Sequence, residues 1–94
     1  MHVISLRALK DFWARYPPSQ GPLSTWHEMM ERLEFDNFVE LRRVFSSADL
    51  VGGKIVFNIG GNKYRLITTI HFNRHKVFVR DVLTHAEYDK GAWK

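Results

Sequence analysis

The chain has 94 residues, 45% of them hydrophobic and 26% charged, which predicts one small globular domain spanning residues 1–94 and excludes a second domain. It contains no cysteine, which excludes a disulfide framework, a thiolate zinc site and a cysteine nucleophile. The net charge of +4 is unevenly distributed, because residues 50–94 hold eight Lys or Arg against three Asp or Glu. This half of the chain is therefore expected to bind a polyanion. The alternative is that its lysines only keep strand edges soluble.

The chain opens on a short edge strand, predicted at residues 1–4, followed by Ser5 as a candidate N-cap. Apolar residues then recur at three- and four-residue spacing from Leu6 to Tyr16, with charged residues on the other side. This pattern predicts an amphipathic helix. Pro17-Pro18 ends it, because the residue before a proline is disfavoured in helical conformation.

A second helix is predicted after a polar connector at residues 19–22. Its apolar stripe runs from Leu23 to Leu33, so the first two helices form a hairpin. Asp36 is a candidate cap for a shorter third helix that carries Phe38 to Phe45. The polar residues 46–49 are then predicted to form a connecting segment after this helix.

The pattern changes at Gly52-Gly53 to alternating β-branched and aromatic residues, which predicts a sheet. Residues 60–62 and 73–74 supply the turns of an antiparallel meander, and residues 88–94 form a short polar tail. We therefore expect an α+β fold in which the N-terminal helices pack on one face of a twisted antiparallel sheet, leaving the other face for solvent or a ligand. The strands are predicted at about 54–59, 63–72 and 75–83.

Two short motifs have alternative interpretations. Residues 60–63, Gly-Gly-Asn-Lys, could be compared with a phosphate-binding loop, but their spacing and their place between two strands favour a hairpin turn. His71 and His75 could suggest a metal site, but no third ligand lies close in sequence, so no metal site is predicted.

A set of polar residues along the predicted sheet and just beyond it suggests chemistry on phosphate. Arg65 lies in mid-strand between Tyr64 and Leu66, so if these two face the helices, Arg65 faces the open side. A guanidinium group stabilises phosphate charge, and a histidine can transfer a proton near neutral pH. These groups, with a tyrosine, are sufficient for metal-free RNA cleavage, in which the 2′-hydroxyl attacks its own phosphate. The set comprises Asn58, Lys63, Arg65, Arg80, His85, Tyr88, Asp89 and Lys90.

Three segments carry a resemblance to a known family. They are the opening residues 2–10, the run at 56–66 (Val-Phe-Asn-Ile-Gly-Gly-Asn-Lys-Tyr-Arg-Leu) and the run at 84–90 (Thr-His-Ala-Glu-Tyr-Asp-Lys). On these residues the chain resembles the HigB-type toxins of the RelE superfamily, the mRNA-cleaving toxins of type II toxin–antitoxin modules. The resemblance covers essentially the whole chain and implies a RelE-like fold.

The resemblance also implies site residues. Arg65 matches the superfamily's phosphate-stabilising arginine, whereas Asn58 and His85 stand near positions where RelE has a lysine and a second arginine. This departure assigns the general acid or base to His85, and Tyr88 takes the place of a C-terminal catalytic tyrosine. The catalytic residues expected are therefore Arg65, His85 and Tyr88. Residues expected to bind RNA are Lys54, Asn58, Asn62, Lys63, Arg80, Asp89 and Lys90.

The expected activity is that of an mRNA interferase, an endoribonuclease that inhibits translation by cleaving mRNA on the ribosome without metal or cofactor. The resemblance implies a HigA-like helix-turn-helix antitoxin as partner, and operator DNA bound only through that antitoxin. No apolar run approaches the roughly 18 residues of a membrane span and no signal peptide is evident, so we expect a cytoplasmic protein without membrane contact. The alternative is a non-catalytic RNA- or protein-binding domain that uses the same basic sheet face.

Overall fold

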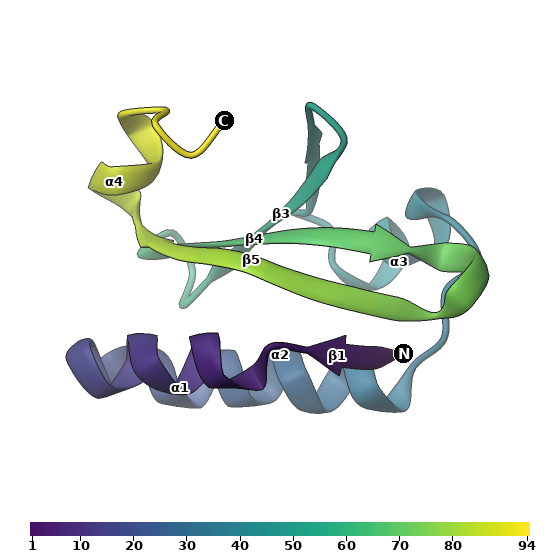
Figure 1. Cartoon of the computed structure of the whole chain (residues 1–94), viewed down its shortest axis with the longest axis horizontal. Coiled ribbons are helices and arrows are strands. Elements are labelled where there is room, and N and C mark those ends of the chain that lie inside the picture. The colour runs from purple at the N-terminus through teal and green to yellow at the C-terminus, as the bar shows by residue number, and fades with distance from the viewer.

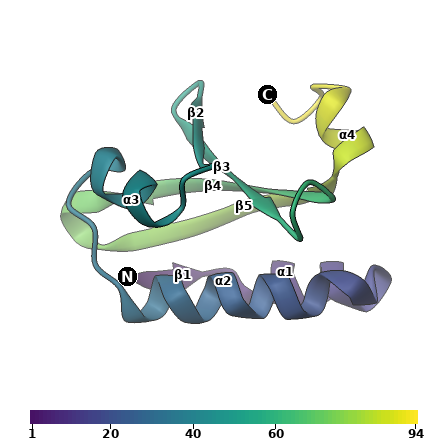
Figure 2. The same cartoon turned by 180° about the vertical axis from the view of Figure 1, so that it is seen from behind.

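A computed structural model describes all 94 residues as a five-stranded mixed sheet with helices against it. The strand order is β1-β5-β4-β3-β2, and α1 and α2 lie side by side beneath one face (Figures 1 and 2). The α+β architecture expected from the sequence is therefore confirmed. The elements are β1 (His2–Ile4), α1 (Leu6–Arg15), α2 (Gln20–Arg32), α3 (Phe38–Val44), β2 (Asp49–Val51), β3 (Lys54–Ile59), β4 (Tyr64–His71), β5 (Lys76–Thr84) and α4 (His85–Asp89), with 3-10 turns at Pro17–Ser19 and Phe72–Arg74.

Three strands, β3, β4 and β5, form the predicted antiparallel meander. The edge strand β1 pairs with β5 in the parallel direction, and β2 adds an antiparallel strand beside β3 at the other edge. The turn between β3 and β4 uses Gly60 and Gly61 at φ values of 63° and 69°, a left-handed conformation that glycine adopts without steric cost. The hairpin interpretation of this motif is thus confirmed.

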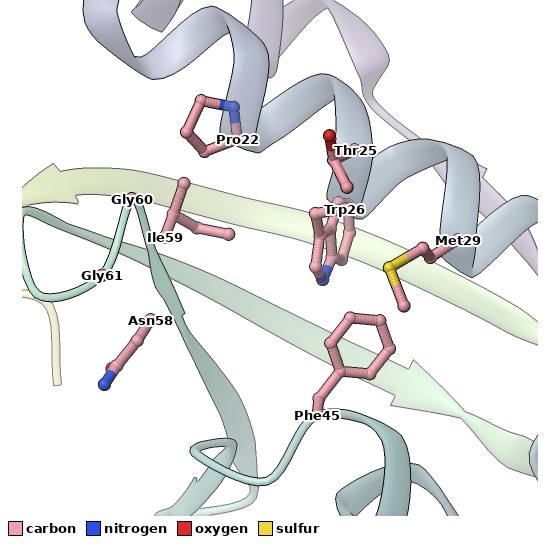
Figure 3. Close-up of a pocket in the computed structure, with 9 residues that line it drawn as sticks. All are labelled: Pro22, Thr25, Trp26, Met29, Phe45, Asn58, Ile59, Gly60 and Gly61. Carbon is pink, nitrogen blue, oxygen red and sulfur yellow. The ribbon is translucent and has the colours of Figure 1, made fainter.

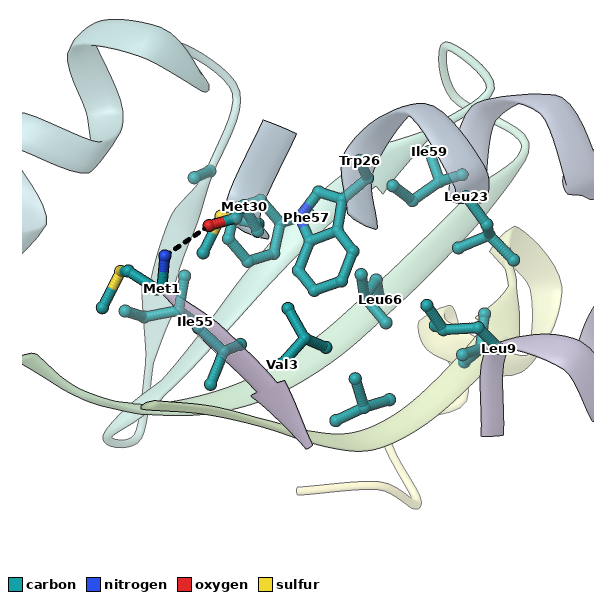
Figure 4. Packing of buried hydrophobic residues seen from close by; sticks show 14 of the residues in the cluster. Met1, Val3, Leu9, Leu23, Trp26, Met30, Ile55, Phe57, Ile59 and Leu66 are labelled. Carbon is teal, nitrogen blue, oxygen red and sulfur yellow. Dashed lines mark hydrogen bonds between the residues drawn. The ribbon is translucent and has the colours of Figure 1, made fainter. Parts of the chain in front are cut away.

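The hydrophobic core lies between the sheet and the α1–α2 hairpin (Figure 4). Trp26 of α2 meets Phe57 of β3 edge to face, with ring centroids 5.4 Å apart. Phe12 of α1 meets Tyr64 of β4 in the same way at 5.5 Å. The amino group of Met1 donates a hydrogen bond of 2.7 Å to the carbonyl of Met30, near the C-terminal end of α2. One face of the sheet is therefore fully occupied by packing.

The predicted connector at residues 19–22 is wrong. A 3-10 turn leads directly into α2, which already begins at Gln20, and Ser19 is buried. Pro22 is compatible with this early start because it occupies the first turn of the helix, where backbone N–H groups have no acceptor within the helix. Both Pro17-Pro18 and the hairpin are otherwise as predicted.

Two predicted helix caps differ in detail. Ser5 does precede α1, but it has φ 78° and its side chain makes no capping hydrogen bond. The third helix is capped by Asn37 and not by Asp36, since the Asn37 side chain accepts a 2.9 Å hydrogen bond from the backbone N–H of Glu40. The Glu40 carboxylate in turn accepts from the N–H of Asp36, so Asp36 supplies a donor where an acceptor was expected.

The C-terminal residues are not the simple tail that was predicted. Thr84 and Glu87 form a reciprocal capping box that starts the short helix α4, which includes Tyr88 and Asp89. The chain then folds back so that Trp93 stacks on Tyr88, with ring centroids 4.8 Å apart. Strand β2 was also missed. No helix in the structure has the length and apolar character to cross a bilayer.

Candidate functional site

The second face of the sheet, away from α1 and α2, carries the polar residues of interest. Tyr64 packs against α1, so the next residue along β4, Arg65, points to the opposite face. Asn58 of β3 lies directly across from Arg65 in the strand register. Cross-strand partners project to the same side of a sheet, so these two side chains share the second face.

Arg65 is held in place by three hydrogen bonds and one aromatic ring. It is only 8% exposed. Nη1 donates to the carbonyls of Asn62 and Tyr64, and Nη2 donates to Oδ1 of Asn62 at 2.7 Å. Its Cζ lies 5.4 Å from the centre of the Tyr88 ring. All five ion pairs of the chain involve other residues, so the positive charge of Arg65 is fixed in position but not neutralised.

Arg65 and Tyr88 line a polar cavity of about 420 Å³ on this face. Its walls come from α3, the segment after α3, β2, β3, β4 and α4, so residues far apart in sequence meet there. The lining offers two guanidinium groups, a phenol, an amide, a hydroxyl and one carboxylate. The lining residues are Arg42, Ser47, Ala48, Asp49, Val56, Asn58, Arg65 and Tyr88.

His85 is not part of the lining of this cavity, although it shares the short helix α4 with Tyr88, which is. It is the first residue of α4, and its backbone N–H donates to the carbonyl of Lys63 at 2.9 Å, which joins α4 to the β3–β4 turn. Its Nδ1 lies 3.0 Å from the Asp89 carboxylate, one turn along the helix. This contact directs the proton to Nδ1 and leaves Nε2 free to exchange a proton. His85 and Tyr88 are three residues apart and so lie on the same side of α4.

Other expected RNA-binding residues are dispersed around the site. Lys54 donates from Nζ to the carbonyl of Trp93 at 3.2 Å, and Lys63 is exposed in the β3–β4 turn. Lys90 borders a separate hollow beside Trp93. Arg80 lies farther along β5, where its Nε donates to Thr69 at 3.0 Å. Arg80 is therefore not brought together with Arg65.

The C-terminal segment ties α4 to the edge of the sheet. The indole Nε1 of Trp93 donates to the carbonyl of Tyr88 at 2.9 Å, and the two rings stack at an interplanar angle of 17°. The Lys54 ammonium lies 5.9 Å from the Trp93 ring centre, in addition to its hydrogen bond with the Trp93 carbonyl. The Lys54 contacts place the C-terminal segment against β3, and the Trp93 contacts hold Tyr88 in position.

A second, more apolar groove of about 450 Å³ lies between α2 and the β3–β4 turn (Figure 3). Trp26, Met29 and Phe45 form its walls. Ile59 points toward α2, whereas Asn58 points away from it. The groove therefore belongs to the packing side of the molecule, and it offers no cationic group for phosphate.

Sequence reasoning missed Arg42, Ser47 and Asp49, which line the polar cavity. Arg42 is a basic residue in the last turn of α3, and no motif singles it out. Ser47 and Asp49 belong to the polar run at 46–49, which the sequence predicts as a connecting segment. The only available signal was the polar run at 46–49 itself, because the pairing of β2 with β3 that brings this run to the site is a tertiary feature.

No group of three or more His, Asp or Glu residues is arranged to hold a metal ion. His75 pairs with Glu34, while the ring of His71 packs against Phe78 at 5.2 Å. The pKa of Glu87 is lowered, chiefly because its carboxylate accepts a hydrogen bond from the backbone N–H of Thr84.

Comparisons with known proteins agree with this picture. The model of the HigB toxin family, described as the RelE-like toxic component of a toxin–antitoxin system, matches residues 19–91. The mRNA interferase toxin HigB of Escherichia coli strain K12 is 35% identical over 92 residues, covering 95% of this chain and 88% of the relative. The mRNA interferase HigB of Shigella flexneri matches equally well. That of Escherichia coli O6:H1 is 30% identical over 93 residues, covering 96% and 90% of the two chains.

Proposed function

Because this chain belongs to the HigB family of RelE-like toxins, the toxic components of toxin–antitoxin systems, we propose that it is an mRNA interferase, an endoribonuclease that stops translation. The resemblance inferred from the sequence is confirmed at the level of the family. The proposal is supported most directly by one observation: a buried, unneutralised guanidinium, Arg65, lies 5.4 Å from the ring of Tyr88 at a polar cavity.

The proposed reaction is cleavage by the RNA's own 2′-hydroxyl. This oxygen attacks the adjacent phosphate, and negative charge accumulates on the phosphate oxygens in the transition state. Arg65 stabilises that charge, and Arg42, the second cation of the lining, supports it from α3. The proton-transfer groups on α4 are Tyr88, which lines the cavity, and His85, three residues before it on the same helix. The products are a 2′,3′-cyclic phosphate and a 5′-hydroxyl.

Flanking RNA is bound by the remaining polar residues around the cavity. Asn58 lines it, and Lys63 projects from the neighbouring turn. Asn62 acts mainly by holding Arg65, and Asp89 acts mainly by orienting His85. Lys54, Lys90 and Arg80 lie farther out and would contact the backbone of mRNA or of ribosomal RNA, where contacts are electrostatic and salt-sensitive.

Membership of a toxin–antitoxin family implies an antitoxin partner and mRNA as target. We further propose that the antitoxin is a HigA-like helix-turn-helix protein, that operator DNA is contacted only through it, and that cleavage takes place on translating ribosomes in the cytoplasm. The ribosomal setting is supported by the cationic residues outside the cavity, Lys54, Lys63, Lys90 and Arg80, because one scissile linkage does not require them.

The test is cleavage of a defined mRNA on programmed ribosomes by purified protein. Arg65→Ala should lower kcat by roughly 100-fold or more, the scale of one lost transition-state contact. Arg74→Ala is the matched control, since Arg74 is an exposed arginine in the β4–β5 turn, and it should leave kcat unchanged. Wild-type protein that binds programmed ribosomes without cutting mRNA would favour the binding-only alternative, and unchanged cleavage by Arg65→Ala would reject the role of Arg65.

A further inference from the structure

The polar cavity contains one carboxylate, that of Asp49, among its cationic and neutral groups. Asp49 is the first residue of β2 and pairs with Val56 of β3. Paired residues in antiparallel strands project to the same side, and Val56 also lines the cavity, so strand pairing directs the Asp49 side chain to this face. The position is set by the sheet and not by a loose loop.

The Asp49 carboxylate has no protein partner. It takes part in none of the five ion pairs, although Arg42 and Arg65 line the same cavity. It also accepts none of the side-chain hydrogen bonds of the chain. An exposed and unpaired carboxylate is a competent proton acceptor.

A carboxylate in this place opposes the binding of RNA. It carries the same sign as the phosphate that the two arginines would bind, so it weakens ground-state affinity. A group that costs affinity and holds no other residue in place contributes nothing to a site that only binds RNA. Its presence is explained if it acts on the one proton that must leave the substrate before the 2′-oxygen can attack.

We propose that Asp49 is the general base of RNA cleavage, an inference that rests on the endoribonuclease function proposed above. Its carboxylate takes the proton of the ribose 2′-hydroxyl while the 2′-oxygen forms a bond to the adjacent phosphorus. The bond between phosphorus and the 5′-oxygen breaks, the oxygen keeps the bonding pair, and it receives a proton from Tyr88. A proton returned from Asp49 to Tyr88 through solvent resets the enzyme.

His85 is the competing candidate for the base, and its geometry is less suited to that role. It is absent from the cavity lining, and its Nδ1 is engaged by Asp89 at 3.0 Å. Its place beside Tyr88 on α4 fits the acid side of the reaction, where a proton is delivered to the leaving group. The two sides of the cavity, β2 and α4, then hold the base and the acid respectively.

The two candidates differ in how the rate depends on pH. The unperturbed pKa of an aspartate is about 3.9 and that of a histidine is about 6.5. With Asp49 as base, the single-turnover rate of the wild-type protein on programmed ribosomes should show no fall from pH 7.5 to 5.5. Asp49→Asn should lower kcat by roughly 100-fold with KM unchanged or lower, since a repulsive charge is removed, and Asp49→Glu should restore part of the rate.

Asp11→Asn is the control, because Asp11 is an exposed carboxylate of α1 on the other side of the sheet. Asp11→Asn should cleave at the wild-type rate. Circular dichroism should show that Asp49→Asn is folded. A kcat of Asp49→Asn within threefold of wild type would overturn the inference, as would a wild-type rate that falls about tenfold between pH 7.5 and 5.5. In both cases a slow Arg65→Ala would leave the endoribonuclease function intact, whereas an inactive wild-type protein would refute that function itself.

Discussion

At the scale of single residues, Asn62 determines how Arg65 is presented to the cavity. It supplies two of the three acceptors of the guanidinium, one from its main chain and one from its side chain at 2.7 Å. The remaining N–H groups of Arg65 are left for an anion. Asn62 is therefore better understood as a positioning residue than as the direct RNA contact expected from the sequence.

Substitution of Asn62 tests this positioning role in two directions. Asn62→Ala removes one acceptor and keeps both main-chain acceptors, so kcat should fall by about 10-fold, the value of one hydrogen bond to a charged group. Asn62→Asp would place a carboxylate against the guanidinium and neutralise its charge, so kcat should fall further than in Asn62→Ala. Single-turnover cleavage on programmed ribosomes measures both. Equal rates for the two variants would contradict this account.

At the scale of elements, α4 depends on contacts outside itself. A helix of five residues is far too short to be stable alone, so its capping box and the contacts of Trp93 must hold it. Trp93 stacks on Tyr88, bonds to its carbonyl, and accepts from Lys54 on β3. The C-terminal segment thereby fixes the ring that lies over Arg65.

Trp93→Ala should loosen α4 and Tyr88 together. The stacked pair is worth about 0.5–1.5 kcal/mol beyond buried area, so the free energy of unfolding should fall by about 1 kcal/mol and kcat by about 10-fold. Trp93→Phe keeps a stacking ring and should recover most of the rate. Cleavage assays and thermal melts separate the effects. A Trp93→Ala variant with wild-type kcat would show that the segment does not position Tyr88.

The sequence predicted best those elements in which one period persists over several residues. Strand β3 begins and ends where the alternation from 54 to 59 predicts, and the apolar stripes of α1 and α2 locate both helices. Strand β2 and α4 have three and five residues, too few for a period to be visible. For α4 the remaining signal was the capping pair of Thr84 and Glu87.

The same reasoning explains which site residues could be predicted. The face of Arg65 follows from alternation about Tyr64 and Leu66, which is local information. Asp49 and Arg42 reach the cavity only through the pairing of β2 with β3 and the placement of α3, which no local pattern encodes. Arg80 was expected on the same surface, but Leu83 is the partner of Arg65 in the register, so Arg80 lies about 10 Å farther along β5.

At the scale of the whole molecule, the sheet separates stability from chemistry. Side chains on one face pack against α1 and α2, and those on the other face line the polar cavity. Because the side-chain period of a strand is two, adjacent residues of β4 point to opposite faces, so one contributes to stability and the next to the site. A chain of 94 residues can in this way use a single sheet both as the base of its core and as the floor of its site.

Leu66 and Arg65 give the sharpest test of this separation, since they are neighbours in β4. Leu66 is fully buried in the core, so Leu66→Ala should lower the free energy of unfolding by about 2–5 kcal/mol, while the folded fraction keeps its cleavage rate. Arg65→Ala should change stability by only about 1 kcal/mol and abolish most cleavage. Chemical denaturation and single-turnover assays measure the two quantities independently. If Leu66→Ala is too unstable to assay, Leu66→Val provides the same test with a smaller cavity. A comparable loss of cleavage rate per folded molecule in the Leu66 and Arg65 variants would refute the separation.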